Sequence, residues 1–121
     1  MKYMLLIYHD EIAWDALTEA ERQQIYLEYR QLIQELQTSG KYLGGDQLQA
    51  TSTASTVRVR KGKPMVTDGP FAETREQLGG FFMIEVMDMT EASAIAARIP
   101  AAREGSIEIR PVVESSQPAV A

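Results

Sequence analysis

The chain has 121 residues, which is long enough for one domain whose hydrophobic core needs neither disulfides nor a structural metal. Hydrophobic residues make up 45% and charged residues 24%, as in ordinary globular proteins, and the formal net charge of −5 argues against nucleic-acid binding, because phosphate contacts need a basic surface. The absence of cysteine excludes a disulfide scaffold, a thiol nucleophile and a cysteine-ligated metal centre.

The first expected element is a strand over residues 3–8, an uninterrupted apolar run of the kind found in strands buried on both faces. His9 and the two acidic residues after it end this run, which is too short for the apolar region of a signal peptide. No other segment approaches the roughly 18 apolar residues of a membrane span. We therefore expect a cytoplasmic protein that does not contact a membrane, and the lack of cysteine fits a reducing compartment.

A long amphipathic helix is predicted next. Thr18 and Glu21 have the spacing of a capping box, in which each side chain satisfies a free backbone N–H at the start of a helix. Gly40 lies where a left-handed C-terminal cap would stand. Between them, apolar residues recur on one stripe at helical spacing: Ile25, Tyr29, Leu32, Ile33 and Leu36. The pattern predicts about six turns at 3.6 residues each.

The middle of the chain is expected to form strands. Residues 42–45 predict a short, irregular strand, and residues 56–60 alternate strictly between polar and apolar side chains, as in a strand with one solvated face. Lys61-Gly62-Lys63 can turn this strand back into residues 64–67, which predicts a hairpin with glycine at the bend.

The last third of the chain predicts a strand, a helix and a second strand. Residues 81–86 are typical of a central strand, and Asp88 is placed to cap the helix that follows. Its expected core stripe, which Pro100 should end, comprises Ala92, Ile95, Ala96 and Ile99. Residues 107–110 alternate like an edge strand, and residues 114–121 are expected to be a disordered tail.

This order predicts an α+β domain over residues 1–113, a ferredoxin-like split βαβ antiparallel sheet with two helices on one face. The other face of such a sheet would be bare. Because the strands carry so many apolar residues, we expect a homodimer that buries this face, with a ligand cleft between the sheet and the second copy.

The segment 68–81, with the sequence DGPFAETREQLGGF, closely resembles the signature of the DGPF branch of the YCII-related family. The opening MKYMLLIY of residues 1–8 and the closing GSIEIRPV of residues 105–112 are also similar to that family, so the resemblance covers residues 1–113. It implies a ferredoxin-like α+β fold that pairs as a dimeric α+β barrel.

The resemblance implies less about function. Related YCII-type proteins are thought to use a His–Asp pair with the histidine on the first helix, some relatives catalyse elimination-type chemistry, and DGPF proteins are often encoded beside sigma factors of the extracytoplasmic-function type. In this chain residues 25–30 of that helix contain no histidine. The single histidine is His9, after the first strand, and the family's pair is not transferred to it.

The DGPF segment has a structural and a functional interpretation. Asp68 can begin a turn, with Phe71 anchoring the loop in the core, or it can stand at the rim of a cleft as a base or a cation ligand. Glu73, Arg75 and Glu76 can be a solvated charge run or a lid over the pocket. The glycine pair at 79–80 permits a bulge or a close backbone approach.

Three further residues have two interpretations each. His9 follows a buried strand and can shuttle a proton near neutral pH, or it can be an ordinary hydrogen-bonded residue. Arg58 and Arg60 share one strand face, where they either hold a carboxylate or phosphate or protect an exposed edge. One histidine without cysteine offers no metal-ligand spacing, so neither a metal nor a cofactor is expected.

The sequence therefore predicts a dimeric protein that binds a small anionic molecule in a cleft beside the DGPF loop. Asp68 and His9 are the candidates for cofactor-independent acid–base chemistry, such as elimination. The candidate ligand-binding residues are Arg58, Arg60, Phe71, Glu73 and Arg75. The alternative is a regulatory interaction module that acts with an extracytoplasmic-function sigma factor.

Overall fold

The computed structural model describes residues 1–114. Of the predicted disordered tail, 114–121, only Glu114 lies within the described residues. In chain order the elements are β1 (Lys2–His9), α1 (Glu11–Asp15), α2 (Glu19–Thr38), β2 (Tyr42–Gln47), the 3-10 turn η1 (Thr51–Thr53), β3 (Ser55–Arg60), β4 (Lys63–Asp68), β5 (Gln77–Glu85), α3 (Met89–Ala96), the 3-10 turn η2 (Pro100–Arg103) and β6 (Ser106–Pro111).

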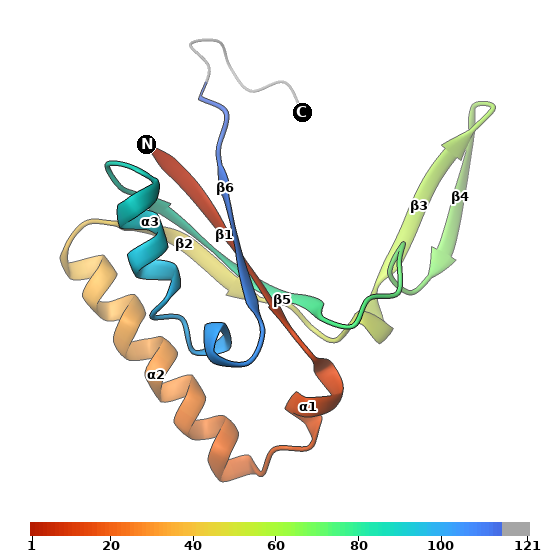
Figure 1. Ribbon diagram of the computed structural model, residues 1–121. Coiled ribbons are helices and arrows are strands. Elements are labelled where there is room, and N and C mark those ends of the chain that lie inside the picture. The colour runs from red at the N-terminus through yellow and green to blue at the C-terminus, as the bar shows by residue number, and fades with distance from the viewer. Residues whose placement is uncertain (115–121) are drawn as a thin grey trace.

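A four-stranded antiparallel sheet in the order β2-β5-β1-β6 forms the body of the molecule. Helices α2 and α3 cover one face of this sheet (Figure 1). Within residues 1–114 the strands β3 and β4 pair only with each other, and in the chain they lie between β2 and β5. This arrangement confirms the predicted ferredoxin-like α+β fold with two helices on one face of the sheet.

The core lies between the sheet and the two helices because strand side chains alternate between the faces. On β1 the side chains of Tyr3, Leu5 and Ile7 are buried under the helices, while the alternate residues are only half-buried. The sequence predicted a strand buried on both faces, but within the described protomer only one face of β1 is buried. The rest of the buried cluster comprises Leu32, Leu36, Phe82, Ile84, Val86, Ala92, Ile95, Ala96 and Ile99.

The predicted helix caps are present. The Thr18 backbone N–H donates to Glu21 Oε1 at 2.9 Å and the Glu21 N–H donates to Thr18 Oγ1 at 3.2 Å, which completes the capping box of α2. Gly40 has a left-handed φ of 74° just beyond the helix. Helix α3 ends at Ala96, before the predicted boundary at Pro100. That proline begins the 3-10 turn η2 instead.

Strand β5 begins at Gln77, earlier than the predicted residue 81, because the glycine pair lies inside the strand rather than before it. The register with β1 shifts between Ile7 and Tyr8, so that Gly79 has no direct partner across the ladder. The bulge that the glycines were expected to permit is therefore confirmed, and it lies within the central pair of strands.

Residues 55–68, which we call the arm, form the predicted β3–β4 hairpin. Its turn is made by Lys61 and Gly62, both with positive φ angles of 51° and 75°. At its base, Gly69 N–H donates to Ala54 O at 2.7 Å and Thr56 Oγ1 donates to Gly69 O at 2.8 Å. The arm projects away from the sheet and helices (Figure 1).

Candidate functional site

A cavity of about 960 Å³ lies on the helix-covered side of the sheet. Its wall comes from the ends of β1 and β2, the start of β5, helices α1 and α2, and the turn η2. Apolar side chains such as Ile25, Ile33 and Phe82 line its floor, and polar groups gather where the strands end. The volume and the mixed wall are those of a small-molecule site. The cavity therefore lies within one protomer, opposite the bare face where the sequence placed a cleft.

His9 is the last residue of β1, and its imidazole forms part of the cavity wall. The ring lies over Gly79, where an added methyl group would come within 2.4 Å of His9 Nε2. The Trp14 ring meets the imidazole edge-on, with the ring centroids 5.8 Å apart. Only glycine at position 79 leaves space for the imidazole in this place, which confirms the close approach predicted for the glycine pair.

The short helix α1, which was not predicted, brings Trp14 to this wall. Asp10 caps it by accepting the Ile12 N–H at 2.9 Å. The Glu11 N–H donates to Gln77 Oε1 at 2.9 Å, while the Glu11 carboxylate accepts the Thr51 N–H at 2.8 Å and the Thr51 hydroxyl at 2.5 Å. These bonds join α1 to β5 and η1, so the position of α1 depends on contacts distant in sequence.

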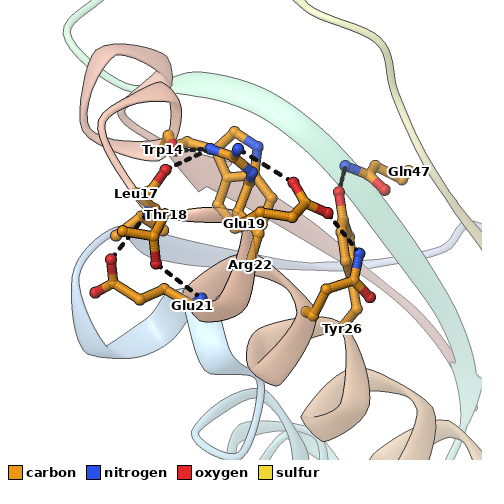
Figure 2. A network of polar contacts seen from close by, with 9 residues as sticks. Trp14, Leu17, Thr18, Glu19, Glu21, Arg22, Tyr26 and Gln47 are labelled. Carbon is orange, nitrogen blue, oxygen red and sulfur yellow. Dashed lines mark hydrogen bonds and ion pairs between the residues drawn. The ribbon is translucent and has the colours of Figure 1, made fainter.

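A second group of polar contacts joins α1 to α2 (Figure 2). Arg22 Nη1 on α2 donates to the carbonyls of Trp14 and Leu17 at 3.3 and 2.7 Å, which satisfies the end of α1. The Tyr26 ring meets Trp14 edge-on at 5.6 Å, and its hydroxyl accepts a hydrogen bond from Gln47 Nε2 at 3.1 Å. His9, Trp14 and Tyr26 thus form a continuous aromatic wall.

Tyr29 lies deeper in the cavity and contacts Phe82 edge-on, with ring centroids 6.2 Å apart. Burial raises the pKa of Tyr29 to about 12, although the backbone of Ala101 and the charge of Arg103 oppose the shift. The phenol is consequently neutral at physiological pH and offers a hydrogen-bonding group without a charge.

Charged side chains of both signs surround the cavity: Arg30, Arg75, Arg103, Asp46, Glu76 and Glu104, with Asp10 beside His9. Arg103 Nη1 forms an ion pair with Glu28 Oε2 at 2.8 Å, and Glu76 Oε1 accepts a hydrogen bond from Ser106 Oγ at 2.8 Å. Within residues 1–114, Arg30 and Arg75 form no ion pair closer than 4.0 Å. Two guanidinium groups are thus available to an anionic ligand.

The structure brings together only part of the predicted site. His9 and Arg75 line the cavity, and so does Glu76 of the expected lid, whereas Glu73 does not. Arg58 and Arg60 lie on the arm and Asp68 at its base, outside the cavity wall. A role in ligand binding or catalysis for these arm residues stays a prediction.

The expected core anchor at Phe71 is wrong. Its side chain is 79% exposed. The DGPF turn is instead held by hydrogen bonds between the Gly69 backbone and both the Ala54 carbonyl and the Thr56 hydroxyl, with Gly69 at a φ of 90° that favours glycine. The loop therefore needs no apolar anchor.

Sequence reasoning missed Trp14, Tyr26, Gln47 and Arg30 as cavity residues. The signal available was Asp10 as a helix cap, with Trp14 four residues later, but a helix of five residues is too short to give a periodic pattern. Among residues 1–114 no group of three or more histidine, aspartate or glutamate side chains could hold a metal ion.

The fold and the cavity define a small ferredoxin-like α+β protein with a ligand-sized cavity between its sheet and its first long helix. The chain belongs to the YCII-related family, because the model of the YCII-related domain matches residues 1–116. It is also 34% identical over 114 residues to the uncharacterized protein R00369 of Rhizobium meliloti strain 1021, an alignment that covers 93% of this chain and 92% of that protein. None of the helices within residues 1–114 is long and apolar enough to cross a membrane.

Proposed function

We propose that this protein binds a small molecule with an apolar or aromatic body and an anionic group in the cavity beside His9. The observation that carries the proposal is the combination, in one cavity of about 960 Å³, of the aromatic wall and two arginines that form no ion pair within the described part of the chain. The wall of Trp14 and Tyr26 suits a flat or apolar body, while Arg30 and Arg75 suit a carboxylate or phosphate.

His9 supplies the imidazole of this cavity, a group that can both accept and donate a proton. Within residues 1–114 no hydrogen bond occupies its side chain, so a ligand would not have to displace a protein partner from the imidazole. If the ligand carries an acidic C–H or O–H group, His9 is the proposed base, in cofactor-independent chemistry of the elimination type. Tyr29, a neutral phenol, would orient the ligand without adding charge.

The chain's single tryptophan makes a direct binding assay possible, because Trp14 belongs to the cavity wall. We would titrate the protein with benzoate, phenylacetate and phenyl phosphate, and with benzamide as a neutral match, and follow Trp14 fluorescence. The proposal expects a saturable change with at least one anion and at least about tenfold weaker binding of the neutral amide. Equal binding of amide and anion would contradict the anionic part, and no saturable change with any probe would contradict the site.

Variants locate the binding site. Arg30→Gln and Arg75→Gln should each weaken binding of the anion by about tenfold, since each removes one charged donor. Arg58→Gln on the arm is the matched control, with the same chemical change outside the cavity. If Arg58→Gln weakens binding and the cavity variants do not, the arm site predicted from the sequence is supported and the cavity proposal is wrong.

Two finer assignments belong to the same proposal. The sequence of Asp68 to Phe71 supports placing the chain in the DGPF branch of the family. The bare face of the sheet carries Met4, Leu6, Phe81 and Met83, all half-buried, which supports a homodimer that covers this face. The regulatory alternative, with a sigma factor as partner, stays a prediction from the family resemblance.

A further inference from the structure

The arm has two faces of different character, because residues paired across an antiparallel ladder point to the same side. Val57 pairs with Val66, and Val59 pairs with Pro64, so one face is entirely apolar over these four positions. The three valines are 60–66% exposed. The structure therefore leaves a continuous apolar surface in water on an element that projects from the body (Figure 1).

The opposite face of the arm is basic. Arg60 pairs with Lys63, and Arg58 pairs with Met65. With Lys61 at the turn, residues 55–68 carry four cations and one carboxylate, a net charge of +3, which leaves −8 on the rest of a chain whose total is −5. Charge is thus strongly separated between the arm and the body of the same molecule.

An arm of this kind is energetically unfavourable when water surrounds it on both faces. A two-stranded ribbon is only marginally stable in water, and exposed apolar side chains on both of its strands add to the penalty. The body of its own protomer does not cover the valines, as their exposure shows. A surface that remains apolar on both strands of a ribbon is typical of an interface.

We propose that the arm docks on a second copy of this chain, with its valine face packed against that copy, and that the positive charge of the arm favours its approach to the acidic body of that copy. The body, with a net charge of −8, is electrostatically complementary to an arm of +3. Nucleic acid would contact the cations but leave the valines in water. The acidic body would also repel both nucleic acid and an anionic membrane. The inference rests on the proposed homodimer and specifies a contact outside the sheet face.

Sedimentation velocity over a dilution series tests this contact. Val57→Thr/Val66→Thr removes apolar surface from one cross-strand pair and keeps the β-branched shape, so the hairpin itself is retained. We expect it to weaken the dimer by at least about tenfold. The matched control Met65→Thr lies on the opposite face of the same ribbon and should change the dissociation constant by less than about threefold.

Charge reversal supplies an independent measurement. Arg58→Glu/Arg60→Glu should also weaken the dimer, and the wild-type dissociation constant should rise with salt as screening increases. The variant Leu6→Lys places a charge on the bare face of the sheet and so tests the homodimer independently of the arm. If Leu6→Lys dissociates the dimer while all arm variants leave it unchanged, the arm inference is wrong and the homodimer stands. A wild-type protein that remains monomeric at every concentration would overturn both.

A crosslink shows where the arm binds. The chain has no cysteine, so Lys61→Cys at the tip can be labelled uniquely with benzophenone maleimide. With mixed ¹⁴N and ¹⁵N protein, the expected products join the arm of one isotope to the body of the other. Exclusively intramolecular products would overturn the inference, as would crosslinking only after addition of phosphatidylglycerol vesicles, which would identify a membrane as the occupant.

Discussion

The imidazole of His9 lies so close to Gly79 that a methyl group on the glycine would stand 2.4 Å from Nε2. The position of the His9 ring at the end of β1 therefore requires glycine at position 79, the bulge residue of β5. This contact fixes the ring beside Trp14 at the cavity wall, since the space over β5 exists only without a side chain at position 79.

The first prediction concerns this pair. Gly79→Ala should lower the free energy of unfolding by about 1–3 kcal/mol, because an inserted methyl group forces the imidazole away. Urea denaturation would measure the change. His9→Ala removes the side chain that supplies the three atoms nearest to the added methyl group, so in that background Gly79→Ala should cost less than about half as much. Equal costs in both backgrounds would show that the strain lies in the backbone.

The second prediction concerns Tyr29 and alkaline pH. Burial raises its folded-state pKa to about 12, against an ordinary value of 10.0. The folded protein therefore holds this proton more tightly than the unfolded chain, so its contribution to stability is full below pH 10 and is lost as the pH rises through about 12. Between these limits Tyr29 should account for a loss of about 2 kcal/mol.

The measurement is the urea midpoint of wild type and Tyr29→Phe between pH 8 and pH 12. Tyr8 and Tyr42 also have raised pKa values through burial, so the comparison with Tyr29→Phe isolates one residue. The variant should lose less stability with rising pH than wild type. Parallel pH profiles for the two proteins would contradict the assigned burial effect.

The third prediction concerns the attachment of α1. Glu11→Ala leaves the Thr51 N–H and hydroxyl without their carboxylate acceptor, and we expect it to cost about 1.5–3 kcal/mol. The emission of Trp14 should shift to longer wavelength as α1 loosens. Glu73→Ala, an exposed carboxylate outside the cavity wall, is the control and should change stability by less than about 0.5 kcal/mol. An unchanged Trp14 spectrum in Glu11→Ala would mean that other contacts hold α1.

The fourth prediction concerns the start of α2. Thr18→Ala removes the hydroxyl that accepts the Glu21 N–H, and it should cost about 1 kcal/mol. Thr38→Ala, at the last residue of the same helix, is the matched control because its side chain forms no described hydrogen bond. The two should differ in urea midpoint. Thr18→Ser should restore most of the loss, since serine is an equally good cap.

Local patterns were sufficient for most of the fold. The capping box of Thr18 and Glu21 predicted the start of α2, and period-two alternation predicted the arm strands. Both signals depend on residues that are only a few positions apart in the sequence. The extent of β5 was predicted less well, since glycine is unfavourable in a strand interior unless a neighbouring residue needs the space. That neighbour, His9, is 70 positions away.

The site was predictable only in part for the same reason. His9 and Arg75 were named from the sequence and do line the cavity, but the arrangement that joins them to Trp14, Tyr26 and Arg30 arises from contacts between distant segments. Phe71 shows the converse: an aromatic residue in a loop favoured a core anchor, whereas the turn at Gly69 is held by hydrogen bonds with Ala54 and the Thr56 hydroxyl, and the ring is exposed.

By itself the sequence determined the order of the strands and of the two helices α2 and α3, the family and the amphipathic character of the arm, because these follow from composition, periodicity and a long local motif. Only the tertiary structure decided that the cavity lies on the helix side of the sheet, that His9 rather than Asp68 lines it, and that the arm stands clear of the body. The physical reason is packing. Which side chains share a space depends on register and on bulges such as the one at Gly79, and these are set by contacts across the whole chain.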